Sequence, residues 1–387
     1  QMCIRDWTEV SADVTEAAPD EESAEGETED PTAGGAFGDF GGMAMPPMFG
    51  QASGYTQFEL KAGQTYHITI EATANSELKD MQLCLNWIKP GDAEANYEAA
   101  VQAAKDYDTV VMTVYHTETN DELALDDEEQ EKLLLDVIAA AKEAGNKVVV
   151  VGYLGVPVDV TAWIDDVNAF IQMWLPGQAV GEATANLLTG AVNPSGKLPV
   201  TWPKSADDAQ TDGLPETGSE ITIDEGIYMG YRWYDENDIE PQYDFGYGLS
   251  YTTFEYSDLV VEEAAGEGEA YGYDVTFTVT NTGDVAGSEI AQVYLGEVEV
   301  PENIMIAKYQ LAGFTKVKDL EPGESRTVTV HIDQRSLSYW DVNIDDENMY
   351  QREDGTQDKW TVAAGERTIY VGAASDNLIL SETVTVE

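Results

Sequence analysis

Two stretches decide the fold of this sequence: WLPGQ at residues 174–178 and NPSGKLPVTWP at residues 193–203. The first follows a short apolar run at residues 170–174, which Pro-Gly brings to an end. Alanine, leucine and valine then recur at helical spacing over residues 179–188. This order predicts a strand that leads into a helix through a tight turn.

The end of that helix is also marked in the sequence. Gly190 stands where a left-handed residue closes a helix, and the Asn-Pro-Ser-Gly that begins the second stretch cannot continue one. Residues 198–202 then have the pattern of a new extended segment. The whole run predicts one strand–helix–strand unit of an open α/β sheet, with the prolines and glycines in structural turns.

The same alternation begins further upstream. Helices are expected at residues 93–107 and 126–144, and strands at residues 109–114 and 148–151. Strands that alternate with helices predict a mostly parallel sheet covered on both faces. Ligands of such sheets bind beyond the carboxyl ends of the strands, so we expect chemistry in the loops that follow Val114, Val151 and Trp174.

From residue 271 the pattern changes to short alternating strands separated by turns. These strands are expected at residues 275–280, 289–295, 310–314, 326–332, 360–363 and 368–372. Short strands at this spacing predict an antiparallel β-sandwich of about one hundred residues. The acidic, glycine-containing stretch before it, residues 259–270, is interpreted as a linker.

The first 57 residues lack the composition of a packed domain. No Lys or Arg occurs between residues 6 and 60, and the segment is rich in acids, glycine and methionine. Such a segment cannot bury enough apolar surface to offset its ordering entropy, so residues 1–57 are expected to be disordered. The alternative is that the Phe and Met residues between positions 37 and 49 form a partner-binding patch. Residues 58–71 alternate around a turn and predict a β-hairpin.

The charge of the chain excludes several classes of partner. Its 387 residues include 19 Lys and Arg against 74 Asp and Glu, a formal net charge of −55. Such a field repels nucleic acid, anionic membranes and polyanionic sugars, so a neutral substrate is expected. The two cysteines lack metal-like spacing, and no apolar run approaches the roughly 20 residues that cross a bilayer. We expect no cofactor, no metal and no membrane insertion. The compartment is not determined by the sequence, and a secreted or a cell-surface location is weakly favoured.

Four tryptophans could bind sugars or pack in the interior. They are Trp163, Trp174, Trp202 and Trp233. Indole rings stack on sugar rings, but they also supply large apolar surfaces to protein cores. The sequence around these four favours packing within or between domains.

Three ordered motifs give the sequence a family resemblance. W-x-PGQ with NPSGKLPVTWP, then DEGIYMGYRWYD at residues 224–235 and FGYGLSYTTF at residues 245–254, resemble the α/β-sandwich domain of glycoside hydrolase family 3. The order VTNTG, AQVYL, LAGFTKV, LEPGES and VGAAS resembles the fibronectin type III-like domain that closes many members. A strand–turn–strand pattern ending in LNW resembles the tail of a carbohydrate-associated β insert.

The resemblance implies a fold class of α/β plus all-β, with a mostly parallel sandwich domain followed by an immunoglobulin-like antiparallel sandwich. The expected domains are an acidic segment at residues 1–57, a partial β insert at 58–90, the α/β-sandwich domain at 91–258, a linker at 259–270 and the fibronectin type III-like domain at 271–387.

By this resemblance, the whole enzyme would hydrolyse terminal β-D-glucosyl or β-D-xylosyl residues with retention and without a cofactor. Retaining hydrolysis needs two carboxyl groups roughly 5–5.5 Å apart, one that attacks the anomeric carbon and one that protonates the leaving oxygen. In the family the attacking aspartate belongs to a preceding β/α barrel, which the residues before position 58 are too few to form. The barrel is therefore expected as a missing partner domain, and this chain alone is expected to be inactive.

The resemblance offers one catalytic candidate, Glu118. It begins Glu118-x-x-Asp121 just after the strand at residues 109–114, which matches the start of the family's E-x-x-D-R, with Glu122 where the arginine is expected. Glu118 would be the acid/base, and the alternative of equal weight is a solvated loop acid. The altered motif favours a second class of function, a non-catalytic carbohydrate-associated or scaffolding protein without the barrel. The intact NPSGKLP and FGYGLSYT segments favour the C-terminal part of a working enzyme.

Overall fold

The computed structural model divides the chain into two compact units, Gln1–Ala99 and Ala100–Glu387. The residues described are 2–5, 7–16, 51–54, 66–74, 83–85, 92–116, 123, 125, 128–208, 225–264, 271–351 and 357–387. Before residue 93 the description covers the backbone alone.

The first unit contains two small antiparallel sheets. β1 (Met2–Arg5) lies between β3 (Gln51–Gly54) and β5 (Leu83–Leu85), and β2 (Trp7–Glu16) pairs with β4 (Tyr66–Ala74). β1, β2 and β3 lie within residues 1–57, where the composition predicts disorder, and the other residues of that segment lie outside the described ones, so the prediction for the segment stays untested. Val10, Ala12 and Val14 alternate with polar residues, a strand signal that the acidic composition concealed. Positions 37–49 and the first strand of the hairpin expected at 58–71 lie outside the described residues.

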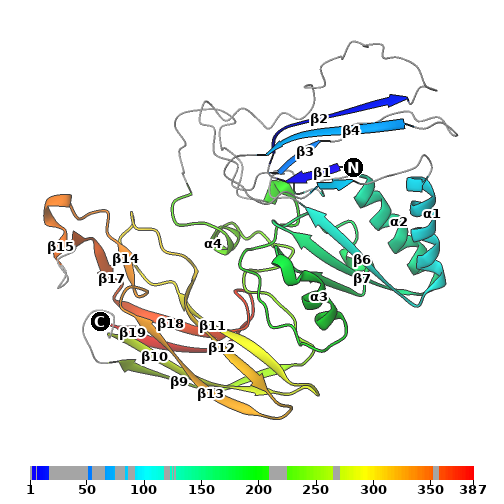
Figure 1. The fold of residues 1–387 in the computed structure, drawn as a ribbon. Coiled ribbons are helices and arrows are strands. Elements are labelled where there is room, and N and C mark those ends of the chain that lie inside the picture. Colours follow the sequence, from blue (N-terminus) through cyan, green and yellow to red (C-terminus); the bar gives the residue numbers. More distant parts are fainter. Residues whose placement is uncertain are drawn as a thin grey trace. The chain divides into compact units, whose positions relative to one another are not determined.

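The second unit begins with an α/β part. Its elements are α1 (Asp92–Asp106, which begins in the first unit), β6 (Thr109–His116), α2 (Glu128–Ala144), β7 (Lys147–Leu154), β8 (Ala169–Gln172) and α3 (Val180–Leu188). β6, β7 and β8 form a parallel sheet in that order (Figure 1). The expected helices and strands of this region are confirmed. Gly190 follows α3 with a left-handed φ of +72°, as a helix-ending glycine should.

The prediction for the last strand of the expected strand–helix–strand unit is wrong. Residues 198–202 do not join the parallel sheet. The N–H of Trp202 instead donates to the carbonyl of Tyr243 at 2.8 Å, which makes an isolated antiparallel bridge. The chain bends at residues 199–200, and Pro199 and Pro203 lack the N–H groups that a sheet ladder requires, so the segment cannot continue the sheet.

The core of the α/β part lies between α2 and one face of the sheet. Leu134, Val137 and Ile138 of α2 are at most 3% exposed, and they are buried together with Val148 and Val150 of β7. Acidic residues fill the first turn of α2, where they suit the positive end of the helix dipole. None of the described helices is long and apolar enough to cross a membrane.

The remainder of the second unit is an antiparallel sandwich. Its strands are β9 (Phe254–Ala264), β10 (Gly272–Asn281), β11 (Gly287–Gly296), β12 (Tyr309–Leu320), β13 (Ser325–Asp333), β18 (Gly365–Gly372) and β19 (Leu378–Val386). They form the sheets β13-β10-β9 and β12-β11-β18-β19. Phe277, Val293 and Val371 are fully buried in the core of this part. An α/β part followed by an all-β part confirms the predicted fold class.

β9 begins the sandwich earlier than the sequence suggested. It pairs with β10 along its length, so it covers the end of the region expected as α/β and the first half of the linker expected at residues 259–270. Tyr256, Leu259 and Val261 pack on the sandwich core, which breaks the simple period of two. A register shift between Thr276 and Thr278 of the partner strand marks the irregularity. An interrupted alternation of this kind is difficult to recognise as a strand from sequence.

Candidate functional site

The carboxyl ends of three parallel strands meet at one edge of the α/β sheet. β6 ends at His116, β7 at Leu154 and β8 at Gln172. Ligands of open α/β sheets bind at this edge. Glu118, the predicted acid/base, follows β6 by two positions in the sequence and lies outside the described residues.

The described residues on either side of Glu118 in the sequence are held in place. On one side, the amide of Gln130 in α2 accepts from the N–H of Tyr115 at 2.9 Å and donates to its carbonyl at 3.0 Å. On the other side, Leu125 is only 8% exposed, and the carbonyl of Leu123 accepts from the N–H of Asp159 at 2.6 Å. The end of β6 and the approach to α2 are therefore fixed in space.

A polar group of β8 also reaches this edge. Gln172 donates from Nε2 to the carbonyl of Leu154 at 2.8 Å, and its Oε1 is buried without a hydrogen-bond partner among the described residues. A Cβ at Gly152 would lie 3.0 Å from this Oε1 and 2.9 Å from the Phe170 ring, so a larger residue there would displace one of these side chains. Gln172 was not among the residues predicted from the sequence, although a glutamine within the apolar run AFIQMW was a signal.

The tryptophans near this edge are packed rather than open to a ligand. Trp163 is 2% exposed and Trp202 is fully buried. Both make edge-to-face contacts with Phe170, with ring centroids 5.3 and 6.0 Å apart, and Trp174 lies 6.2 Å from Trp202. Trp202 also donates from Nε1 to the carbonyl of Val158 at 2.8 Å. The predicted packing role is confirmed for these three residues.

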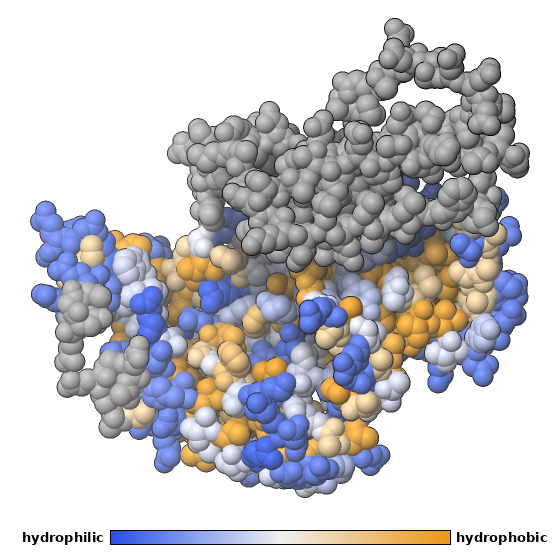
Figure 2. Space-filling model, in the orientation of Figure 1, coloured by the Kyte–Doolittle hydropathy of each residue, from blue (hydrophilic) through white to orange (hydrophobic). Residues whose placement is uncertain are grey.

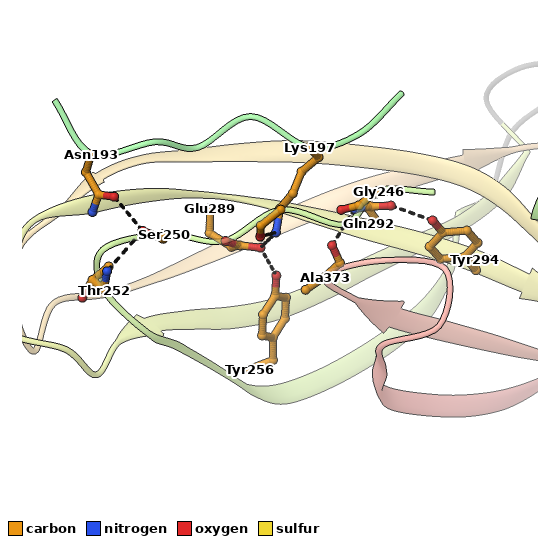
Figure 3. A network of polar contacts seen from close by, with 11 residues as sticks. Asn193, Lys197, Gly246, Ser250, Thr252, Tyr256, Glu289, Gln292, Tyr294 and Ala373 are labelled. Atoms are coloured by element: carbon orange, nitrogen blue, oxygen red, sulfur yellow. Dashed lines mark hydrogen bonds and ion pairs between the residues drawn. The ribbon is translucent and has the colours of Figure 1, made fainter. Parts of the chain in front are cut away.

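The motif NPSGKLP makes its contacts across the junction between the α/β part and the sandwich (Figure 3). The ammonium of Lys197 lies 3.0 Å from the carboxylate of Glu289 and 3.0 Å from the carbonyl of Gly248. Tyr256 donates to Glu289 at 3.1 Å. Burial and the adjacent Glu289 raise the pKa of Tyr256 far above its usual value, so its hydroxyl keeps its proton. Lys197 and Glu289 side chains are only 11% and 6% exposed.

Asn193 and Gln292 complete this junction (Figure 3). Asn193 accepts from the hydroxyl of Ser250 at 2.9 Å and donates to the carbonyl of Ala286 at 3.0 Å. Gln292 donates to the carbonyl of Gly246 at 3.2 Å and to that of Ala373 at 2.7 Å. The residues that carry the motifs therefore join two parts of the chain, and their contacts are structural.

A pocket of about 480 Å³ opens where the loop at 239–247 meets Asp376, in the turn after β18. Its wall includes Tyr243 and Tyr247, stacked with ring centroids 4.9 Å apart, and Asp244. Burial raises the pKa of Asp244 to about 7, and the charge of Asp376 and a hydrogen bond with it add to the shift. The carboxyl group of Asp244 therefore keeps its proton up to near neutral pH.

The short distance between these two carboxyl groups decides whether they could act as the acid pair of a glycosidase. A hydrogen bond brings their oxygens together, whereas glycoside hydrolysis needs a separation of roughly 5–5.5 Å for retention or 6.5–9.5 Å for inversion. No glycosidic bond fits between Asp244 and Asp376 in this arrangement. They do not form a glycosidase pair.

Comparison with known proteins gives the chain its family. The model of the glycosyl hydrolase family 3 C-terminal domain matches residues 34–251, which is more than half of the chain, and that of the fibronectin type III-like domain matches residues 289–375. The chain belongs to glycosyl hydrolase family 3. The family expected from the three motifs is confirmed.

Several relatives illustrate the extent of the similarity. Thermostable beta-glucosidase B of Acetivibrio thermocellus is 36% identical over 74% of this family 3 chain and 36% of its own length. An exo-alpha-(1->6)-L-arabinopyranosidase of Bifidobacterium longum is 36% identical over 77% of this chain and 37% of its own. The crystal structure of DesR, a beta-glucosidase from Streptomyces venezuelae in complex with D-glucose, matches with a TM-score of 0.68 and 36% identity, over 85% of this chain and 40% of DesR. The chain thus spans about two fifths of the length of the relatives it matches.

We predict that Lys197→Ala destabilises this family 3 chain by roughly 3–5 kcal/mol, because Glu289 would remain buried without its counter-charge. Urea unfolding measures the change. The matched control is Lys132→Ala, whose 2.7 Å pair with Asp136 joins side chains that are 66% and 46% exposed, so its loss should cost less than about 1 kcal/mol. The double variant Lys197→Met with Glu289→Leu should recover most of the loss. Equal effects of the two lysine substitutions would contradict the assignment.

We also predict that Asp244→Asn changes the dependence of stability on pH. Since the folded chain holds a proton on Asp244 up to pH about 7, whereas an unfolded chain releases it near pH 4, wild-type stability falls as the pH rises through this window. The neutral amide removes that decline, so the stability of the variant relative to wild type should increase with pH by at most about 1.4 kcal/mol per unit. The charges of three neighbours also affect the pKa values of this acidic cluster, and these residues are not substituted in the variant: Asp235, Asp376 and Lys308. Thermal unfolding between pH 4 and 8 tests this, and parallel curves for the two proteins would refute it.

Proposed function

We propose that these residues are the C-terminal part of a retaining β-glycosidase that hydrolyses terminal β-D-glucosyl or β-D-xylosyl residues. The match of residues 34–251 to glycosyl hydrolase family 3 carries this proposal. The names of two relatives, a thermostable beta-glucosidase B and DesR, support a β-glucoside substrate. The net charge of −55 favours a neutral glycoside over an anionic one.

Within this function, Glu118 is proposed as the acid/base. Its place in the sequence just after β6 supports the role, because polar groups that follow parallel strands face the ligand edge of the sheet. The bonds between Gln130 and Tyr115 and the burial of Leu125 support it further, since they fix the two ends of the loop. A catalytic group must be held in place for its proton transfer to be productive.

The nucleophile is proposed to lie outside these 387 residues, in the part of the protein that corresponds to the remaining three fifths of the relatives. Among the residues that the structure describes, the hydrogen-bonded carboxyl pair of the pocket is Asp244 with Asp376, and its members are too close for hydrolysis. The active site would then be shared, with the attacking carboxylate from one domain and the proton donor from this one.

A second candidate is a non-catalytic carbohydrate-associated or scaffolding protein without the barrel. The sequence supports it at one position: Glu122 stands where the family motif has an arginine. Replacing a cation by an anion close to a carboxylic acid changes the field in which that acid ionises. An assay of the protein together with its barrel discriminates between the candidates.

The first experiment assays the 387-residue chain alone. We expect no release of nitrophenol from aryl β-D-glucoside, β-D-xyloside or α-L-arabinopyranoside, the last because of the relative in Bifidobacterium longum. One carboxyl group cannot supply both the nucleophile and the acid of a retaining reaction. Robust turnover by this chain would contradict the shared active site.

The second experiment uses the protein together with its barrel and tests Glu118→Gln. Turnover of a glycoside with a poor leaving group should fall by about 10²–10⁴, because protonation of the leaving oxygen is lost, while an activated aryl glycoside is affected much less at the glycosylation step. Azide should rescue the variant by attacking the glycosyl-enzyme without base assistance.

The neighbouring Glu122→Gln is the matched control, with an expected loss of less than about tenfold. Full activity of Glu118→Gln without azide rescue would remove Glu118 from the mechanism. A barrel-bearing protein that is inactive on all three substrates even as wild type would favour the non-catalytic candidate.

A further inference from the structure

The sandwich carries a pair of tryptophans that takes no part in the site described above. β14 (Ser338–Trp340) pairs with β17 (Trp360–Val362), and Trp340 lies directly opposite Trp360. The two indoles meet edge to face, with ring centroids 5.4 Å apart and planes at 71°. The guanidinium carbon of Arg335 lies 3.2 Å from the ring centroid of Trp360. Trp360 is thus held by an indole and a cation, which fixes the ring that Trp340 leans against.

Trp340 is exposed where other tryptophans of the chain are not. Its side chain is 43% exposed, whereas Trp163 is 2% exposed and Trp202 is fully buried. Figure 1 shows β14 and β17 next to the short strands β15 (Tyr350–Gln351) and β16 (Gln357–Asp358), β15 being labelled at the left extremity of the sandwich. A large flat ring is therefore presented on a rigid two-stranded ladder, without a core function to explain it.

The surroundings of Trp340 indicate the chemistry of a partner. The end of the molecule labelled β15 in Figure 1 is mostly blue, hence hydrophilic, in Figure 2. Asn343, three residues after Trp340 in the sequence, exchanges hydrogen bonds of 2.6 and 3.2 Å with Asn303, and Asp345 and Glu347 are exposed. The exposed carboxylates oppose a polyanion, and the amides offer hydrogen bonds to a neutral ligand.

We propose that Trp340 is the stacking platform of an accessory binding site for the pyranose rings of a neutral β-glycan. A pyranose offers an apolar face of C–H groups to an aromatic ring and hydroxyls to a polar rim, and both surfaces are present here. The site lies on the antiparallel sandwich, separate from the edge of the parallel sheet. It depends on the proposed function only for the choice of a β-glycan as the ligand.

Native electrophoresis in gels containing barley β-glucan tests this binding without any turnover. The 387-residue chain should be retarded relative to a gel without polysaccharide, and Trp340→Ala should weaken the binding by about tenfold or more, as truncation of a central aromatic contact usually does. Trp340→Tyr should retain most of the retardation, because it keeps a flat ring. Phe314→Ala is the matched control, since Phe314 of β12 is another exposed aromatic residue, at 67%.

The outcomes separate this proposal from the catalytic one. An unretarded wild-type chain, or Trp340→Ala retarded as strongly as wild type with an unchanged unfolding temperature, would overturn the accessory site and leave the assays of Glu118 unaffected. Equal retardation in gels containing polygalacturonate would also overturn it, because a neutral ligand is required. Retardation lost in Trp340→Ala and retained in Phe314→Ala would support it, whether or not the barrel-bearing protein is active.

Discussion

The junction between the α/β part and the sandwich contains a buried ion pair between Lys197 and Glu289, and hydrogen bonds of Asn193 and Gln292 complete it. The side chains are 11% and 6% exposed, so neither charge could be left there without the other. The pair is completed by the carbonyl of Gly248 and the hydroxyl of Tyr256. Because the lysine comes from one part and the glutamate from the other, the pair contributes to their relative orientation together with the hydrogen bonds of Asn193 and Gln292. The motif NPSGKLP is explained by this role.

A fixed orientation matters for an active site assembled from two domains. Small displacements of a reacting group are costly in catalysis, so a proton donor must sit on a rigid base. The parallel sheet supplies such a base, and Gln130 ties the end of β6 to α2 through Tyr115. The pocket carboxyls Asp244 and Asp376 are in hydrogen-bond contact with each other, which is too close for a glycosidic bond to fit between them.

The sequence predicted features that depend on local chemistry and missed features that depend on distant partners. The helix end at Gly190 could be predicted because a left-handed residue there favours glycine. The packing of Trp202 could be predicted because its surroundings are apolar. The ion pair between Lys197 and Glu289 could not be predicted, since nothing in the sequence around either residue indicates the other. β9 was missed because its bulge interrupts the alternation, and residues 198–202 were assigned to the sheet because an extended pattern does not show which strand it will pair with.

Trapping the covalent intermediate tests the central claim most directly. A 2-deoxy-2-fluoro glucoside with an activated leaving group slows the second step of a retaining glycosidase, so the glycosyl-enzyme accumulates and the labelled peptide can be sequenced by mass spectrometry. With the barrel-bearing protein, the account predicts a label on an aspartate outside the 387 residues. A label on a carboxylate within them, such as Asp244 or Asp376, would contradict it.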